Sequence, residues 1–528
     1  MNEHTAEILS QTNFSSIDWV IVLLYLSISV VIGLFVRKFV VNMTDYIGAG
    51  RALGTCLGIA TMTGTEMGLV TVMYSSQKGF TGGFAAFHIA LVAGIVTFLV
   101  GASGFIVAKL RESEVLTIPE YYEKRFDRKT RVLGGIMLAL GGILNMGLFL
   151  KVGSIFIVGV TGLSAQGWAL PLVMTLLLVL VLIYTTLGGM FSVVVTDYIQ
   201  FVVLSAGMLV ATYVAIQVIG WDHLFETIVA AKGQAGFDPF VSEGAFGLEY
   251  VLWMAFTAGL VSCAIWPTAV ARALAAKDAK TVKKQYMWSS ISFMIRFLIP
   301  NFLGIAAFVL ITTKSPELNA LFFPTDGSAP LDNLYAMPIF LGRIIPTGII
   351  GLISAAMIAA FMSTHDSYLL AWSSVLTQDV IAPLRRNGMT GAERIKCTRI
   401  LIVVIGLYIL YWGLFYKGND DIWDYMAVTG AIYFTGSFAV LLGGLYWKRA
   451  SSTGAFLALL SGIFAVVGLG PVQALLGIQI SGERVGLLTV AFSLFVMVLG
   501  SLLFPDNSYA MSEARREALN DKAQMQEV

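Results

Sequence analysis

One apolar run in the second half of the chain carries side chains that could bind a cation. Ala360, Ser363, Thr364 and Ser367 follow the spacing i, i+3, i+4, i+7, so one helical face would present a backbone carbonyl and three hydroxyls. Neutral oxygen ligands of this kind suit a hard cation such as sodium. Membrane hydroxyls also commonly bond to their own helix, but Asp366 lies deep in the same run, where a charged group is costly and usually functional. This hydroxyl stripe therefore predicts a cation site.

Two other runs would bring further oxygen atoms to a similar depth. Asp197 lies about eight residues, or ~12 Å, inside its helix, and Ala60 lies about as deep in an earlier one. A capping or packing hydrogen bond is the alternative role for Asp197. We expect three helices to contribute to one polar centre.

Glycine and proline interrupt two of the apolar runs. Gly58, Gly64 and Gly68 fall in one of them, and Gly259 and Pro267 fall in another, five helices later. Paired breaks at corresponding positions are typical of inverted-repeat transporters, whose solute and ion sites form at the unwound segments. Glycines also allow close helix packing, so both interpretations stay open.

The elements that must position these groups are membrane helices. Of the 528 residues, 57% are hydrophobic and 12% are charged, and the mean hydropathy is +0.82, which lies far outside the range of water-soluble domains. Backbone groups in lipid must pair within their own segment, so each run of ~20 apolar residues is a helix that crosses the bilayer. We predict thirteen spans, at about 17–36, 52–75, 83–109, 132–160, 168–186, 190–217, 249–271, 286–313, 339–378, 400–417, 422–446, 452–470 and 485–504.

The basic residues predict the orientation. With the N-terminus outside, most of the 33 Lys and Arg residues, Arg272 among them, fall in inner segments, and Lys78 falls in an outer loop. This is the distribution that the positive-inside rule requires. Lys151 and Arg296 are left inside spans. We therefore expect an integral protein of the plasma (bacterial inner) membrane with an outer N-terminus and a cytoplasmic C-terminus.

The segments between spans are short. We predict a single transmembrane domain over 1–504 and a cytoplasmic tail over 505–528, with a short amphipathic helix at Trp221–Ala231 on the outer face. The polar start, Met1–Ser16, lacks the features of a removable signal peptide. Three cysteines in or beside apolar spans are expected to be buried thiols without disulfides. No soluble segment is large enough to hold an active site, so an enzyme is not expected.

Four segments together resemble the sodium:solute symporter family, which includes transporters of glucose and galactose, proline, pantothenate, choline and sialic acid. They are Ala60–Thr63, Gly188–Gln200, Trp266–Arg272 and Ser363–Asp379. The resemblance implies an all-α, five-plus-five inverted repeat of the leucine-transporter type. The repeats would lie at about 52–217 and 249–446, with one helix before them and two after.

The same resemblance implies the sodium ligands. The principal site would use the carbonyls of Ala60, Thr63 and Ala360 and the hydroxyls of Ser363 and Thr364. A second sodium site, or the exit path, would involve Asp197, Ser363, Asp366 and Ser367. One or two sodium ions would be carried in each cycle.

The solute site departs from the family's best-known patterns. Gly259 and Ser262 stand where sugar transporters carry an Asn and a Tyr, and Met67 replaces a Gln. Asn145 stands where sialic acid transporters carry a carboxylate-binding Arg. The resemblance thus favours neither a hexose nor sialic acid.

Charged side chains supply the remaining solute-binding candidates, Glu66, Lys151 and Arg296. Arg296 matches a solute-contacting Lys of the sugar transporters. Its guanidinium could clamp a carboxylate with two hydrogen bonds or pair internally with Glu66 or Asp366. Lys151, in the outer half of its helix, could instead reach the outer surface.

These observations predict a sodium-coupled symporter that imports a small organic solute by alternating access. The two signs of charge favour a carboxylate or an amino-acid-like solute, with a sugar, polyol, ureide or nucleobase as alternatives. Proton coupling through Asp197, Asp366 or Glu66 is the nearest rival, and a uniporter or a solute sensor is less favoured. The protein would work as a monomer among membrane lipids, with no nucleic-acid partner.

Overall fold

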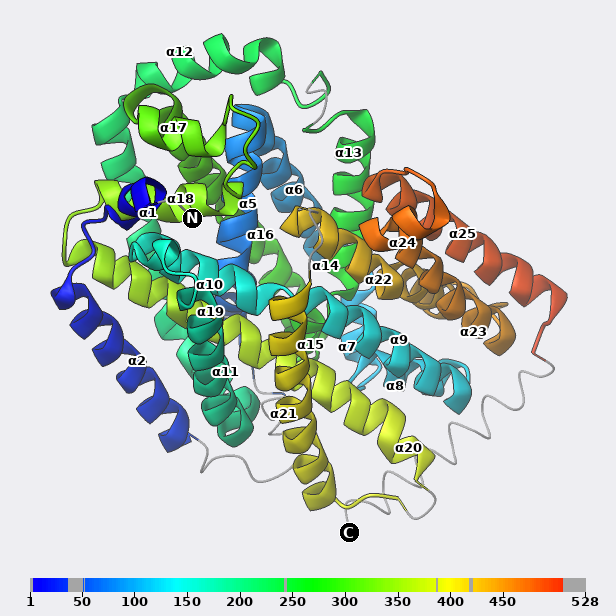
Figure 1. Ribbon diagram of the computed structural model, residues 1–528. Coiled ribbons are helices and arrows are strands. Elements are labelled where there is room, and N and C mark those ends of the chain that lie inside the picture. Colours follow the sequence, from blue (N-terminus) through cyan, green and yellow to red (C-terminus); the bar gives the residue numbers. More distant parts are fainter. Residues whose placement is uncertain are drawn as a thin grey trace.

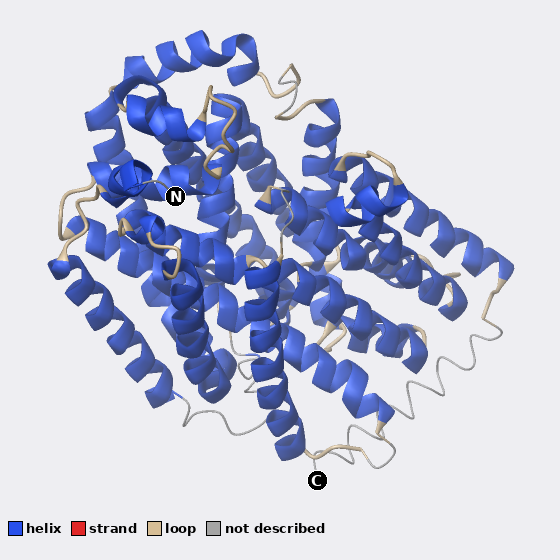
Figure 2. Ribbon diagram, in the orientation of Figure 1, coloured by secondary structure: helices blue, strands red, loops and turns tan. Residues whose placement is uncertain are grey.

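The computed structural model describes residues 3–36, 51, 53–241, 245–385, 388–416 and 421–506. Most of these residues are helical, and no strand occurs among them (Figure 2). The side chains of residues 187–201, within a helical stretch, lie outside the description. The all-α class expected from the composition is therefore confirmed.

Helices of the first half lead from the N-terminus to a short helix across one end of the bundle. They are α1 (Glu3–Ser10), α2 (Ser16–Val36), α4 (Thr55–Glu66), α5 (Leu69–Gly82), α6 (Phe87–Ser103), α7 (Val107–Glu112), α8 (Ile118–Arg125), α9 (Arg128–Met146), α10 (Phe149–Val160), α11 (Ala169–Ile219) and α12 (Trp221–Lys232).

Helices of the second half include several short pieces joined end to end. They are α13 (Leu248–Trp253), the π-helix η6 (Met254–Val261), α14 (Ser262–Ile265), α15 (Pro267–Ala275), α16 (Ala279–Val309), α17 (Pro316–Phe322), α18 (Ala336–Ile344), α19 (Ile349–Val375), the π-helix η9 (Leu376–Ile381), α20 (Ala382–Leu384), α21 (Gly391–Phe415), α22 (Ile422–Tyr446), α23 (Ser452–Ser461), the 3₁₀ helix η10 (Gly462–Gly468), α24 (Gly470–Leu476) and α25 (Gly482–Leu503).

The membrane spans of the described chain number nine by length and hydropathy, or ten if a pair bent by 84°, Ser452–Gly468 and Gly470–Leu476, forms one span. Two expected spans, 168–186 and 190–217, fall in the single element α11. Its described parts are the apolar stretches Ala169–Ile183 and Val202–Ile219. A polytopic helical membrane fold is thus confirmed, while the count of thirteen stays a prediction.

Both expected helix breaks occur. The first separates α4 from α5 at Met67 (φ −92°, ψ 54°) and Gly68 (φ −80°, ψ 165°). The second separates α14 from α15 at Trp266 (φ −54°, ψ 120°). Pro267 then begins α15. Proline has no backbone N–H, and the N–H at this position would have no intrahelical partner in any helix. Both helices are therefore unwound at these residues, which leaves backbone N–H and C=O groups at the breaks without helical partners.

Close packing around the breaks depends on small residues. A Cβ on Gly304 of α16 would lie 1.9 Å from the Ser76 carbonyl of α5, and one on Gly79 would lie 2.0 Å from the Asn301 carbonyl. The two helices therefore touch backbone to backbone. The almost fully buried α19 packs on α2, α4, α11 and α21, and α12 and α17 lie across one end of the bundle, which we term the α12 face (Figure 1).

Candidate functional site

A cavity lies between the two helix breaks. Its empty volume, including the open mouth, is about 1050 Å³, enough for a small organic molecule. The sequence-derived candidates that line it are Glu66, Asn145, Gly259, Ser262, Arg296 and Thr364. Met67 is buried at the break itself, and Lys151 lines a separate cavity at the α12 face. Most of the solute-binding candidates are thus brought together.

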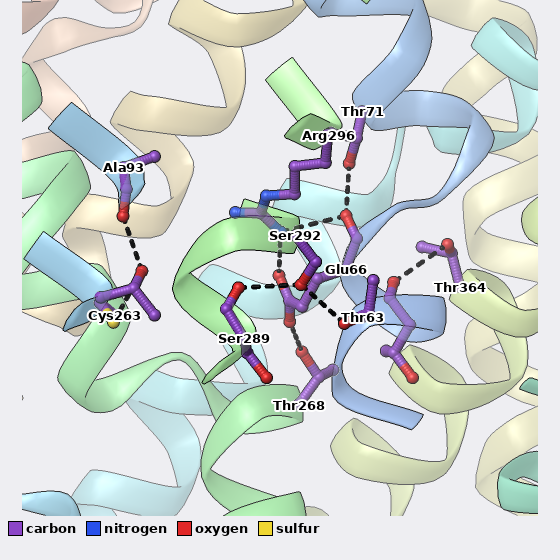
Figure 3. A network of polar contacts seen from close by, with 12 residues as sticks. Thr63, Glu66, Thr71, Ala93, Cys263, Thr268, Ser289, Ser292, Arg296 and Thr364 are labelled. Atoms are coloured by element: carbon purple, nitrogen blue, oxygen red, sulfur yellow. Dashed lines mark hydrogen bonds and ion pairs between the residues drawn. The ribbon is translucent and has the colours of Figure 1, made fainter. Parts of the chain in front are cut away.

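An ion pair joins one break to α16 inside this cavity (Figure 3). Nη1 of Arg296 lies 2.9 Å from Oε2 of Glu66 and donates to the Glu66 carbonyl at 3.1 Å. The Thr268 hydroxyl, from the start of α15, donates to Oε1 of Glu66 at 2.7 Å. The guanidinium also lies over the rings of Phe293 and Phe297, 4.0 and 4.6 Å from their centroids. Of the two roles expected for Arg296, the structure has the internal pair with Glu66.

The hydroxyl stripe of α19 faces the first break. Oγ1 of Thr364 donates to the Ala360 carbonyl at 2.9 Å and lies 3.5 Å from the Thr65 carbonyl. A Cβ built on Gly68 would come within 2.0 Å of the same oxygen. The hydroxyl therefore occupies the space that any other side chain at Gly68 would fill. The structure thus places Thr364 at the α4–α5 break, as expected.

The remaining ligands expected at the principal sodium site lie on the same two elements. Thr63 shares a 2.7 Å hydrogen bond between its hydroxyl and that of Ser292, and its carbonyl accepts the Met67 N–H at 2.8 Å. Ala60 and Ser363 are buried on α4 and α19. The Thr63 hydroxyl is thus directed to α16, and the role of these residues as sodium ligands stays a prediction.

A buried arginine joins the break to the far end of the stripe. Arg272 of α15, 1% exposed, donates from Nη2 to the Thr65 hydroxyl at 2.6 Å and to the Ser367 hydroxyl at 2.9 Å. Ser367 in turn donates to Asp366 at 3.3 Å. The charge count assigned Arg272 to an inner segment just beyond the expected span 249–271, whereas in the structure it is buried within α15. Its position one turn after Thr268, on the same face of one helix, was the signal that could have located it.

Asp197, the last member expected at the second sodium site, lies outside the residues whose side chains are described. Asp366 and Ser367 are both buried in α19. A second sodium site formed by these residues with Ser363 stays a prediction.

Aromatic side chains form much of the cavity wall. Nine of the described residues that line it are aromatic: Tyr74, Phe149, Trp253, Trp266, Phe293, Phe297, Tyr368, Trp423 and Phe434. Trp266, at the second break, packs against Tyr368 and Phe434 with centroid distances of 5.4 and 5.0 Å. The cavity therefore offers ring faces on several sides.

An ion-pair cluster lies on the α12 side of the cavity. Nζ of Lys78 is 3.0 Å from Asp421 and 3.2 Å from Asp424. Lys78 lies one turn beyond Tyr74 on α5, and Asp424 follows Trp423 on α22. The rings of Tyr74 and Trp423 make a T-shaped contact, with their centroids 4.4 Å apart. Lys78 was expected in an outer loop and is instead buried in α5. Two successive contacts thus hold α22 against α5.

A secondary transporter, with a solute cavity between two broken helices, is the class of protein that this fold and cavity define. The sodium:solute symporter family model matches residues 46–462, and the chain belongs to that family. Its members are transporters and not enzymes, and sodium is the ion with which they carry their solutes.

Curated relatives of the chain transport different solutes. It is similar to a sodium/glucose cotransporter of Vibrio parahaemolyticus, with 25% identity over 85% of this chain and 84% of that protein. A sodium/sialic acid symporter of Proteus mirabilis is 25% identical over 86% and 90% of the two chains. An osmoregulated proline transporter of Bacillus subtilis is 24% identical over 84% and 87%.

Solved structures share the fold. A substrate-bound, outward-open Na⁺-coupled sialic acid symporter aligns with a TM-score of 0.75 at 20% identity, covering 94% of this chain and all of that one. MHP1, a nucleobase-cation-symport-1 family transporter with bromovinylhydantoin bound, aligns with a TM-score of 0.56 at 12% identity, over 90% and 99% of the two chains. The leucine-transporter-type fold implied by the sequence is consistent with both.

Proposed function

We propose that this protein imports a small organic solute together with sodium, using the cavity between the two helix breaks and an alternating-access cycle. The observation that supports this most directly is the contact of Thr364 with the α4–α5 break. A cation bound there would touch oxygen atoms of two helices at once, and it would therefore stabilise one arrangement of those helices over another.

The principal sodium site in this proposal consists of Ala60, Thr63, Ala360, Ser363 and Thr364. These residues supply neutral carbonyl and hydroxyl oxygens, which suit sodium without burying a further charge. Asp366, Ser367 and Asp197 would serve a second ion or its exit path. Arg272, which donates to Thr65 and Ser367, would link the two sites.

The α12 face is outside in this proposal, so the N-terminus is outside and the C-terminus is cytoplasmic. The cavity would open to that side when two contacts break: the ion pairs of Lys78 with Asp421 and Asp424, and the ring contact of Tyr74 with Trp423. Transport draws on the sodium gradient and on the membrane potential, which contributes about 2.3 kcal/mol per charge per 100 mV. We propose that one chain in the bilayer completes the cycle.

Proteoliposomes test the coupling ion. They are given an inward sodium gradient and an equimolar panel of sugars, nucleobases, amino acids and carboxylates, and the lumen is analysed by mass spectrometry. At least one compound should accumulate, and replacement of external sodium by choline should abolish its accumulation. Accumulation that persists in choline and follows a proton gradient would instead establish the proton-coupled alternative.

A further inference from the structure

We propose that the solute is an uncharged ring compound with hydrogen-bonding substituents, bound among the aromatic side chains while Glu66 and Arg296 remain paired. This inference rests on the proposed symport function and names the class of solute that the same cavity would take.

The first argument for an uncharged solute is the balance of charge in the cavity. Glu66 and Arg296 are the two charged side chains among the described residues that line it, and they lie 2.9 Å apart. Their charges cancel, and Thr268 satisfies the second carboxylate oxygen. A solute with a net charge would leave one buried charge uncompensated, and that is strongly unfavourable.

The second argument is the packing of Arg296. Its guanidinium is bonded to the side chain and the carbonyl of Glu66 and lies over two phenylalanine rings. Both bonds to Glu66 use Nη1, so a solute carboxylate that took this nitrogen would displace Glu66, which would then be buried without its partner. A zwitterion that paired with both residues would likewise separate them. The carboxylate and amino-acid-like solutes favoured by the sequence therefore fit this cavity less well than an uncharged molecule.

The aromatic side chains and the polar atoms of the cavity wall indicate a ring compound with hydrogen-bonding substituents. Ring faces suit the apolar C–H face of a sugar ring or the flat face of a heterocycle. Among the buried polar atoms of the lining residues, four have no partner: the side-chain amide oxygen of Asn145, the Thr257 hydroxyl, Nε of Arg296 and the Trp423 indole N–H. Buried polar groups are normally hydrogen-bonded, so we infer that solute substituents complete these bonds.

Thermal unfolding of the purified full chain in detergent tests the proposal, since only ligands of the native state raise stability. The probes are matched pairs that differ in charge: D-glucose and D-glucuronate, D-galactose and D-galacturonate, nicotinamide and nicotinate, and uracil and orotate. Proline serves as a zwitterion. Each is added in sodium chloride and in choline chloride of equal ionic strength.

A saturable rise in Tm with a neutral member, and not with its acid, supports the proposal. The sugars and the heterocycles separate the two kinds of ring. A larger rise with an acid or with proline, or no rise with any neutral ring compound, overturns it. Sodium without solute should raise Tm relative to choline. Failure of that arm would count against the symport proposal, whatever the panel shows.

A charge-switch variant tests the mechanism of selection. Glu66→Gln leaves Arg296 without its carboxylate, so the apparent affinity for the acidic member of the recognised pair should rise by about tenfold or more relative to the neutral member. The double variant with Arg296→Gln is neutral again and should return to the neutral member. Glu249→Gln removes an exposed ion pair with Arg484 outside the cavity and should change neither preference.

The sodium-dependent Tm shift shows which variants are folded. If Glu66→Gln alone does not fold, the double variant still tests the charge argument, because it must prefer the neutral member. Rejection of the acid by folded Glu66→Gln, or a preference for the acid in the double variant, would refute charge balance as the basis of selection.

Discussion

Replacement of Gly68 by alanine should weaken sodium binding without straining the backbone. Gly68 has φ −80° and ψ 165°, which alanine adopts freely. The added Cβ, however, would lie 2.0 Å from the Thr364 hydroxyl oxygen, against an ordinary contact of 3.4 Å or more. Either the hydroxyl or the break must therefore move by about 1.4 Å. A shift of this size would take Thr364 away from any position that serves a bound cation.

The magnitude follows from the cost of overpacking, which is typically about 1–3 kcal/mol. If that cost falls on the sodium-bound state, the half-saturating sodium concentration should rise by about 5- to 150-fold. The assay is the dependence of Tm on sodium, with choline keeping the ionic strength constant. Gly54→Ala is a matched control, because Gly54 has nearly the same φ and ψ, also precedes a helix and has nothing within 4 Å of its Cβ.

A double variant separates packing from binding. Gly68→Ala with Thr364→Ala removes the clashing oxygen, so Tm without sodium should recover while the sodium response stays weak. Equal sodium responses of Gly68→Ala, Gly54→Ala and the unmodified protein would refute the placement of the cation at this break.

Three further predictions follow from the packing around the site. Arg272→Lys offers one nitrogen in place of the two that bond to Thr268, Thr65 and Ser367. It should cost about 2–3 kcal/mol, seen as a lower Tm at every sodium concentration. Gly304→Ala should lower Tm by overpacking against α5, whereas Gly391→Ala, with open space at its Cβ, should not. Lys78→Met should release α22 and so expose Cys263, which lines the cavity. In a background where the other two cysteines are replaced by serine, a polar thiol reagent should then label Cys263 faster. An unchanged rate would contradict a closing role for the Lys78 ion pairs.

The sequence was most informative where a single physical property dominates. Long apolar runs can satisfy their backbone in lipid only as helices, so the class of fold was predictable. Gly68 and Pro267 marked both breaks because they weaken a helix locally. The spacing of Ala360, Ser363 and Thr364 likewise predicted which side of α19 would meet the first break.

Side chains whose position depends on tertiary contacts were not predictable. Arg272 and Lys78 lie near span ends, and a count of charges treats such residues as loop residues. In the structure both are buried, because distant carboxylates or hydroxyls satisfy them. For Arg296, the sequence showed that a partner was needed but could not choose between a solute and Glu66. That choice depends on the bend that brings Glu66 beneath α16.

Direct binding of radioactive sodium to the purified protein tests the central claim. The unmodified protein should bind sodium saturably, and Thr364→Ala should weaken that binding by about tenfold or more, as expected for the loss of one ligand worth ~1.4 kcal/mol. Ser373→Ala is the control, because Ser373 is on the same helix run and donates only to carbonyls of its own helix, Leu369 and Leu370. The account predicts a large loss for Thr364→Ala alone, and equal sodium binding by both variants would contradict it.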